Sequence, residues 1–149
     1  MKRRGVNNII IAAIVAFIFI GSIIFVTSHV PERNVSVSED YNVEVNSILS
    51  KVLISKIYDD KYVDDKLISP IYNIYVDGGG ETYNTDVLFD VKHLILDGFS
   101  ISNLAIYTFD EDLKSWIVQP SVFGINSSVI SIHLSVLKNK IFSIGYKSK

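Results

Sequence analysis

Residues 104–120 read LAIYTFDEDLKSWIVQP, and this stretch decides the fold. It holds two runs of strand-forming composition on either side of three consecutive acids: residues 104–109 and 115–118, and Asp110, Glu111 and Asp112. Short acidic side chains suit turns because they accept hydrogen bonds from nearby backbone amides. Lys114 lies close enough to offset part of the negative charge. We therefore predict a β-hairpin with the acids at its tip and Trp116 packed back onto the protein, rather than a catalytic or calcium site.

Strand signals continue on both sides of this hairpin. Apolar and polar residues alternate in residues 41–46, 86–92 and 130–136, which is the pattern of strands with one buried face. Further β-rich runs and the turn signals between them follow at residues 52–58, 71–76 and 140–146, and at 77–80, 97–98, 124–126 and 138–140. These short strands predict an all-β domain over residues 41–149, an immunoglobulin-like antiparallel β-sandwich.

The N-terminal part of the chain differs in character from the rest. Residues 9–26, IIIAAIVAFIFIGSIIFV, are 18 positions without a charge and without the polar stripe of a core helix. A helix of this length is about 27 Å long, and Thr27 and Ser28 extend it to roughly the thickness of the hydrocarbon layer. We therefore predict one N-terminal transmembrane helix over residues 9–28, which precedes the β-sandwich.

Charge predicts the orientation of this helix. Lys2, Arg3 and Arg4 precede it, and the remaining 11 Lys and Arg face 16 Asp and Glu, a net charge of −5. The positive-inside tendency places residues 1–8 in the cytoplasm and the C-terminal domain outside the cell membrane. Residues 29–40 are polar and read as a stalk linker. The acidic balance argues against nucleic acid as a partner, and the absence of cysteine excludes disulfides and thiol chemistry.

Three interpretations of the N-terminus remain open. It is a cleaved secretory signal, an uncleaved signal anchor, or the start of a filament subunit. The third rests on residues 3–17, RRGVNNIIIAAIVAF, which resemble the N-terminus of archaeal type IV pilin-like proteins. The resemblance implies processing at Arg3, Arg4 and Gly5, with cleavage after Gly5, so that the mature chain begins at Val6.

The C-terminal 80 residues also resemble a known module. A Ser-Pro-x-Tyr segment, a glycine turn, a Val-x-Phe strand and a Tyr-x-Phe-Asp-Glu-x-x-x-x-Trp hairpin follow one another: Ser69, Pro70, Tyr72, Val87, Phe89, Tyr107, Phe109, Asp110, Glu111 and Trp116. This order is similar to β-sandwich modules of microbial surface proteins, distantly related to ZU-type domains. The resemblance implies a structural or binding module.

A second group of acids raises the question of calcium. Residues 57–68, IYDDKYVDDKLI, repeat Asp-Asp-Lys, and four carboxylates could gather around the cation: Asp59, Asp60, Asp64 and Asp65. The interleaved Lys61 and Lys66 favour a solvated loop with paired charges, and no EF-hand loop pattern is present. The histidines have no ligand-like spacing. We predict no catalytic residue, no cofactor and no metal ligand.

These observations lead to one functional prediction and one alternative. The chain is expected to be a single-pass membrane-anchored surface protein that presents a small non-catalytic β-sandwich for interaction or structure. The alternative is an archaeal type IV pilin-like filament subunit processed after Gly5. The expected partners are the lipid bilayer and a surface or envelope protein that the sequence does not identify, with neither nucleic acid nor a small-molecule substrate.

Overall fold

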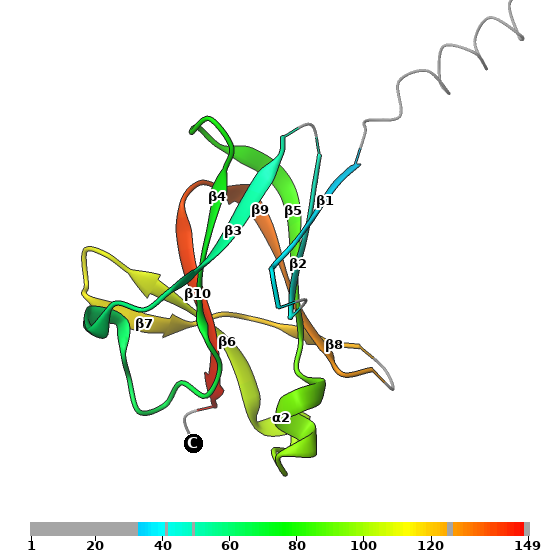
Figure 1. Ribbon diagram of the computed structural model, residues 1–149, viewed down its shortest axis with the longest axis vertical. Helices are drawn as coiled ribbons and strands as arrows, with labels where there is room; N and C mark the ends of the chain where they lie inside the picture. Colours follow the sequence, from blue (N-terminus) through cyan, green and yellow to red (C-terminus); the bar gives the residue numbers. More distant parts are fainter. Residues whose placement is uncertain (1–32, 41, 49, 125–126, 148–149) are drawn as a thin grey trace, which may run out of the picture. The chain divides into compact units, whose positions relative to one another are not determined.

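In the part of the chain that the structure describes, ten strands build two five-stranded sheets that pack face to face (Figure 1). The structure is a computed structural model, and it describes residues 33–40, 42–48, 50–124 and 127–147. Its elements are β1 (Arg33–Val37), β2 (Val43–Ile48), β3 (Val52–Ile57), η1 (Asp60–Tyr62), β4 (Ile71–Val76), β5 (Thr82–Asp90), α2 (Lys92–Leu96), η2 (Ile101–Asn103), β6 (Leu104–Asp110), β7 (Ser115–Val118), β8 (Val122–Phe123), β9 (Val129–Leu137) and β10 (Lys140–Tyr146).

All neighbouring strands run antiparallel. Sheet A has the order β1-β2-β5-β9-β8, and sheet B has the order β3-β4-β10-β6-β7. Among the described strands, the chain crosses between the sheets five times, after β2, β4, β5, β7 and β9. The predicted all-β antiparallel sandwich is confirmed at this level, and the described strands all belong to the unit 33–149.

The main core lies between the two sheets and follows the alternation of the strands. In β9, Ile130, Ile132 and Leu134 are buried, whereas Ser131 and His133 lie on the outer face of sheet A. Tyr72, Phe89 and other large side chains from both sheets complete this cluster: Val43, Val45, Val52, Ile74, Val87, Leu104, Ile106, Leu137, Phe142 and Ile144. The two-residue side-chain period therefore sets which residues form the core.

The outer face of sheet B carries a second hydrophobic cluster. Residues 58–70, here called the strap, connect β3 to β4 and bring Tyr62 onto Ala105, Tyr107 and Trp116. Figure 1 shows η1 of the strap beside β7, at the sheet edge opposite β3. The end of the strap pairs with β10, where Leu67 lies opposite Gly145. A Cβ atom at Gly145 would lie 2.6 Å from the carbonyl oxygen of Lys66, so this close approach requires glycine.

Several segments differ from the sequence-based expectation, and two of them, β1 and Val91, bear on the packing. Arg33–Val37, predicted as part of the linker 29–40, forms β1 and pairs with β2. Its polar Asn34 and Ser36 are half-buried and its valines are exposed, the reverse of the usual pattern. Val91, predicted to continue the strand, lies after the end of β5 at Asp90 and is the N-cap residue of the short helix α2, and its buried side chain joins the core.

The predicted membrane segment lies outside the described residues. This applies to residues 1–8, to the helix 9–28 and to the processing residues Arg3, Arg4 and Gly5. Within the part of the chain that the structure describes, no helix has the length and apolar character needed to cross a bilayer.

Candidate functional site

The acids at residues 110–112 form the tip of a hairpin, as predicted. β6 ends at Asp110 and β7 begins at Ser115, with four turn residues between them. The Oδ1 atom of Asp110 accepts the backbone N–H groups of Asp112 at 3.0 Å and Leu113 at 2.9 Å. This is the local bonding for which short acids are favoured in turns. The carboxylate of Asp110 therefore orders the tip of its own hairpin.

Glu111 connects the tip to the strap. Its Oε1 atom accepts the hydroxyl of Tyr62 at 2.9 Å, and its Oε2 atom accepts Nζ of Lys114 at 2.9 Å. The hydrogen bond from Lys114, followed by that from Tyr62, lowers the pKa of Glu111. Trp116 Nε1 donates to the carbonyl oxygen of Tyr62 at 2.9 Å, and the rings of Tyr62, Phe109 and Trp116 make edge contacts. The tip therefore fastens the strap to sheet B.

The repeated Asp-Asp-Lys motif lies on the strap and pairs its charges locally. Asp59 caps η1 by accepting the N–H of Lys61 at 3.1 Å, and its carboxylate lies 3.5 Å from Nζ of the same lysine. Asp64 accepts the N–H of Lys66 at 3.0 Å and pairs with its Nζ at 3.2 Å. Among the described residues, no three acidic or histidine side chains gather as metal ligands, and this includes Asp59, Asp60, Asp64 and Asp65.

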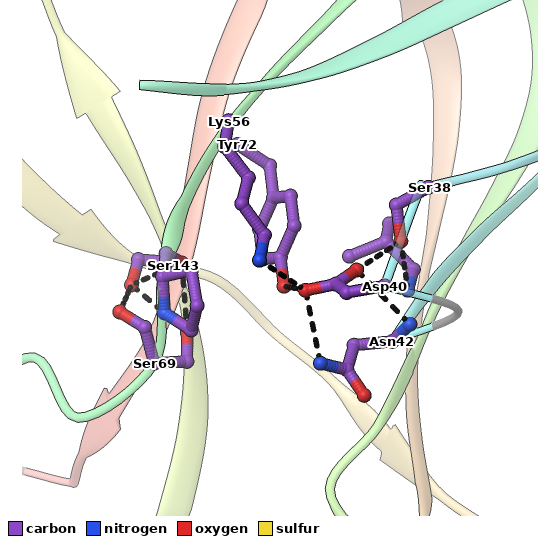
Figure 2. A network of polar contacts seen from close by, with 9 residues as sticks. Ser38, Asp40, Asn42, Lys56, Ser69, Tyr72 and Ser143 are labelled. Atoms are coloured by element: carbon purple, nitrogen blue, oxygen red, sulfur yellow. Dashed lines mark hydrogen bonds and ion pairs between the residues drawn. The ribbon is translucent and has the colours of Figure 1, made fainter. Parts of the chain in front are cut away.

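A polar cluster that the sequence did not reveal joins the two sheets at the β1–β2 turn (Figure 2). Asp40 receives five donors: the Ser38 hydroxyl at 2.6 Å, the Tyr72 hydroxyl at 2.7 Å, Lys56 Nζ at 2.9 Å, and Asn42 Nδ2 and N at 3.0 and 3.3 Å. Lys56 and Tyr72 belong to sheet B, whereas the turn belongs to sheet A. The spacing Ser38-x-Asp40-x-Asn42 is the local signal, because such side chains bond across two residues.

The electrostatics of this cluster favour a fixed ion pair. Burial alone would raise the pKa of Asp40, but the hydrogen bonds from Ser38, Tyr72, Lys56 and Asn42 outweigh it and hold the pKa well below its usual range. The bond to Asp40 raises the pKa of Lys56, and burial followed by that same bond raises the pKa of Tyr72. The ion pair therefore favours the protonated form of Lys56, which is not nucleophilic. The cluster acts as a latch between the sheets.

The outer face of sheet A is polar at its centre. His133 Nδ1 lies 2.7 Å from Asp86 Oδ1, and Asn46 Nδ2 donates to Glu44 Oε1 at 2.8 Å. His133 is 58% exposed and Asp86 48% exposed, so their pairing is a surface contact. Apolar side chains lie toward the rim of this face, where Val35 is 58% exposed and Val37 is 47% exposed. Both valines belong to β1.

The candidate functional element is an edge strand. An edge strand presents backbone N–H and C=O groups that can pair with another strand. Among the described residues, sheet A ends at β1 and β8, and sheet B ends at β3 and β7. β8 has two residues and β7 has four, so these edges offer little backbone. β1 and β3 are the longer edges, with five and six residues.

Comparisons with protein families, with characterised proteins and with solved structures give no significant match for this chain.

Proposed function

We propose that this chain is a single-pass membrane-anchored surface protein whose β-sandwich is a non-catalytic interaction or structural module. One observation carries the proposal. An uncharged run of 18 residues, 9–26, lies between a cationic start and an acidic remainder that carries the β-domain. Such a run supports a membrane helix, and the positive-inside tendency supports a domain outside the cell.

The contacts of the polar residues support a role without catalysis. Four of the acids that sequence reasoning considered for chemistry bond to their own neighbours. Asp110 bonds to the turn, Glu111 to the strap, and Asp59 and Asp64 to nearby lysines. Asp40 and Lys56 satisfy each other in the latch. A general base or nucleophile needs a free reactive form, which these pairings disfavour.

The finer assignment of the fold is part of this proposal. We infer an immunoglobulin-like sandwich akin to the ZU-type modules of surface proteins. Its support is the burial of the residues on which the resemblance rests: Tyr72, Val87, Phe89, Tyr107 and Trp116. Because these are packing residues, they support a fold and a class of module more than a specific ligand.

A pilin-like filament subunit is the second candidate. The observation in its favour is the order Arg3, Arg4, Gly5 directly before the hydrophobic run. In this alternative the chain is cut after Gly5, and the apolar helix packs in a fibre instead of remaining in the bilayer.

The mature N-terminus separates the two candidates. We would measure the intact mass of the protein from washed membranes and from material sheared off the cell surface. A chain that begins at or near Met1 and occurs only in membranes supports the anchor. A chain that begins at Val6 in sheared material supports the filament subunit. A chain cut near Ser28 and released into the medium contradicts both.

A further inference from the structure

At the edge of sheet A, the backbone of β1 presents N–H and C=O groups that point away from β2. The N–H of Ser38 donates to the carbonyl oxygen of Val43 at 2.8 Å, which fixes the phase of the β1–β2 ladder. In an antiparallel pair the residues alternate between those that bond to the partner and those that point away from it. Ser36 and Asn34 therefore bond toward β2, and Arg33, Val35 and Val37 point their N–H and C=O groups away.

β1 also lacks the usual protection of an edge strand. Natural edges are commonly blunted by proline, an inward charge, a bulge or very short length. The sequence of β1 is RNVSV, which has no proline and only one charge, at its first residue. By contrast, β3 contains Lys56, and the short strands β7 and β8 are separated by a loop that contains Pro120. β1 is therefore the edge best suited to accept a strand.

We propose that β1 pairs with the β1 of a second copy of this chain, antiparallel and centred on Val35. In this register Val35 faces Val35 of the second copy, and Arg33 faces Val37 in both directions. All outward groups of Arg33, Val35 and Val37 are then paired, giving about six backbone hydrogen bonds. The two exposed valines of each copy meet on one face, because directly opposed residues share a face.

Charge complementarity selects a second copy in this register. Val37 lies beside Glu44 in the β1–β2 ladder. Across the joined sheet, Arg33 is therefore followed by Val37 and then by Glu44 of the second copy. Two strand spacings are about 10 Å, a span that the long side chains of Arg and Glu bridge. Within the described part of the chain, no carboxylate forms an ion pair with Arg33. Because the dimer is two-fold symmetric, this pair of Arg33 and Glu44 forms twice.

This inference rests on the proposed function, in which the module acts by binding, and it names the partner. The interface is small, so we expect weak association of the isolated domain, with a Kd in the high-micromolar range. On a membrane, anchoring raises the effective concentration of the domains, so a weak contact is sufficient there. The location of the protein and its self-association are measured separately, so that either can fail alone.

The test is the oligomeric state of residues 31–149, which contain the whole compact unit. We would follow molecular mass by sedimentation up to about 1 mM, where association of about 4 kcal/mol is still visible. Val35→Pro removes an outward N–H while leaving the bonds to β2, and prolines are tolerated at such positions. We expect this variant to remain monomeric. Val118→Pro, at an exposed edge position of sheet B whose N–H also points away from its neighbouring strand, is the matched control and should associate like the wild type.

A charge exchange tests the register independently of folding. Arg33→Glu and Glu44→Arg should each weaken association about tenfold, because two attractive pairs become repulsive. The double variant R33E/E44R should return to within about threefold of the wild type. A wild-type domain that stays monomeric overturns the proposal and leaves the edge for a strand of another protein. Association unaffected by Val35→Pro, or no rescue by the double variant, also overturns it.

Discussion

The outer faces of the two sheets differ, although both sheets share one core. The outer face of sheet B is apolar, with Tyr107, Phe109 and Trp116, and the strap covers it. On sheet A the equivalent face carries Glu44, Asp86 and other polar residues, and Asp86 and His133 at its centre are exposed to solvent. The strand sequences reflect this difference. The first five residues of β6, LAIYT, are all buried, whereas β9 alternates apolar and polar residues.

Truncating Trp116, in the apolar cluster between sheet B and the strap, should have the largest effect on stability. Trp116 is 6% exposed and donates to the strap backbone at Tyr62. We expect Trp116→Ala to lower the free energy of unfolding by about 3–5 kcal/mol, because it leaves a cavity under the strap. Urea unfolding measures this. Val122→Ala, at a 70% exposed position of sheet A, should change stability by less than about 0.5 kcal/mol. Equal losses in the two variants would show that the strap does not form a core.

Adding a Cβ atom at Gly145, beneath the strap, should also lower the stability of the fold. Gly145→Ala places a Cβ atom against the carbonyl oxygen of Lys66, and backbone cannot yield as a flexible side chain does. We expect a loss of about 1–3 kcal/mol, as for overpacking. Trypsin should also cut faster at Lys61 and Lys66, because the strap lifts from β10. Ser131→Ala, on the outer face of sheet A, serves as the control. A Gly145→Ala variant that matched it in stability and in the rate of trypsin cleavage would contradict the close approach.

The latch at Asp40 should contribute less to the free energy of unfolding, and its contribution should depend on pH. The pKa of Asp40 is depressed in the folded state, so its contribution is complete above the unfolded pKa of about 4 and is lost as pH falls below it. Asp40→Asn should cost about 1–2 kcal/mol at pH 7, since solvent screens this partly exposed pair. The difference from the wild type should shrink between about pH 5 and pH 2 in urea unfolding. Asp86→Asn is the exposed control. A cost for Asp40→Asn that does not change with pH would mean that the latch does not depend on charge.

Local patterns predicted most of the sheets because strands with one buried face alternate visibly. The runs at β4, β7 and β10 match the prediction residue for residue. β1 was missed because its exposed valines and half-buried polar residues invert the pattern. The latch was missed because Lys56 and Tyr72 reach Asp40 across 16 and 32 residues, a proximity that only the tertiary fold creates. The strap was missed because its coverage of sheet B likewise depends on long-range contacts.

The smallest effect is expected at the hairpin tip, where the covered face ends. Asp110→Asn keeps an oxygen that accepts the N–H groups of Asp112 and Leu113, so stability should hardly change. Asp110→Ala loses both bonds and should cost about 1 kcal/mol. Calorimetric titration of residues 31–149 with calcium should give no heat of binding at micromolar concentrations, because Oδ1 of Asp110 and both carboxylate oxygens of Glu111 are engaged with the turn and the strap. Micromolar calcium binding that disappears in Asp110→Asn would instead make the tip a metal site. The acids would then bind calcium in addition to stabilising the turn.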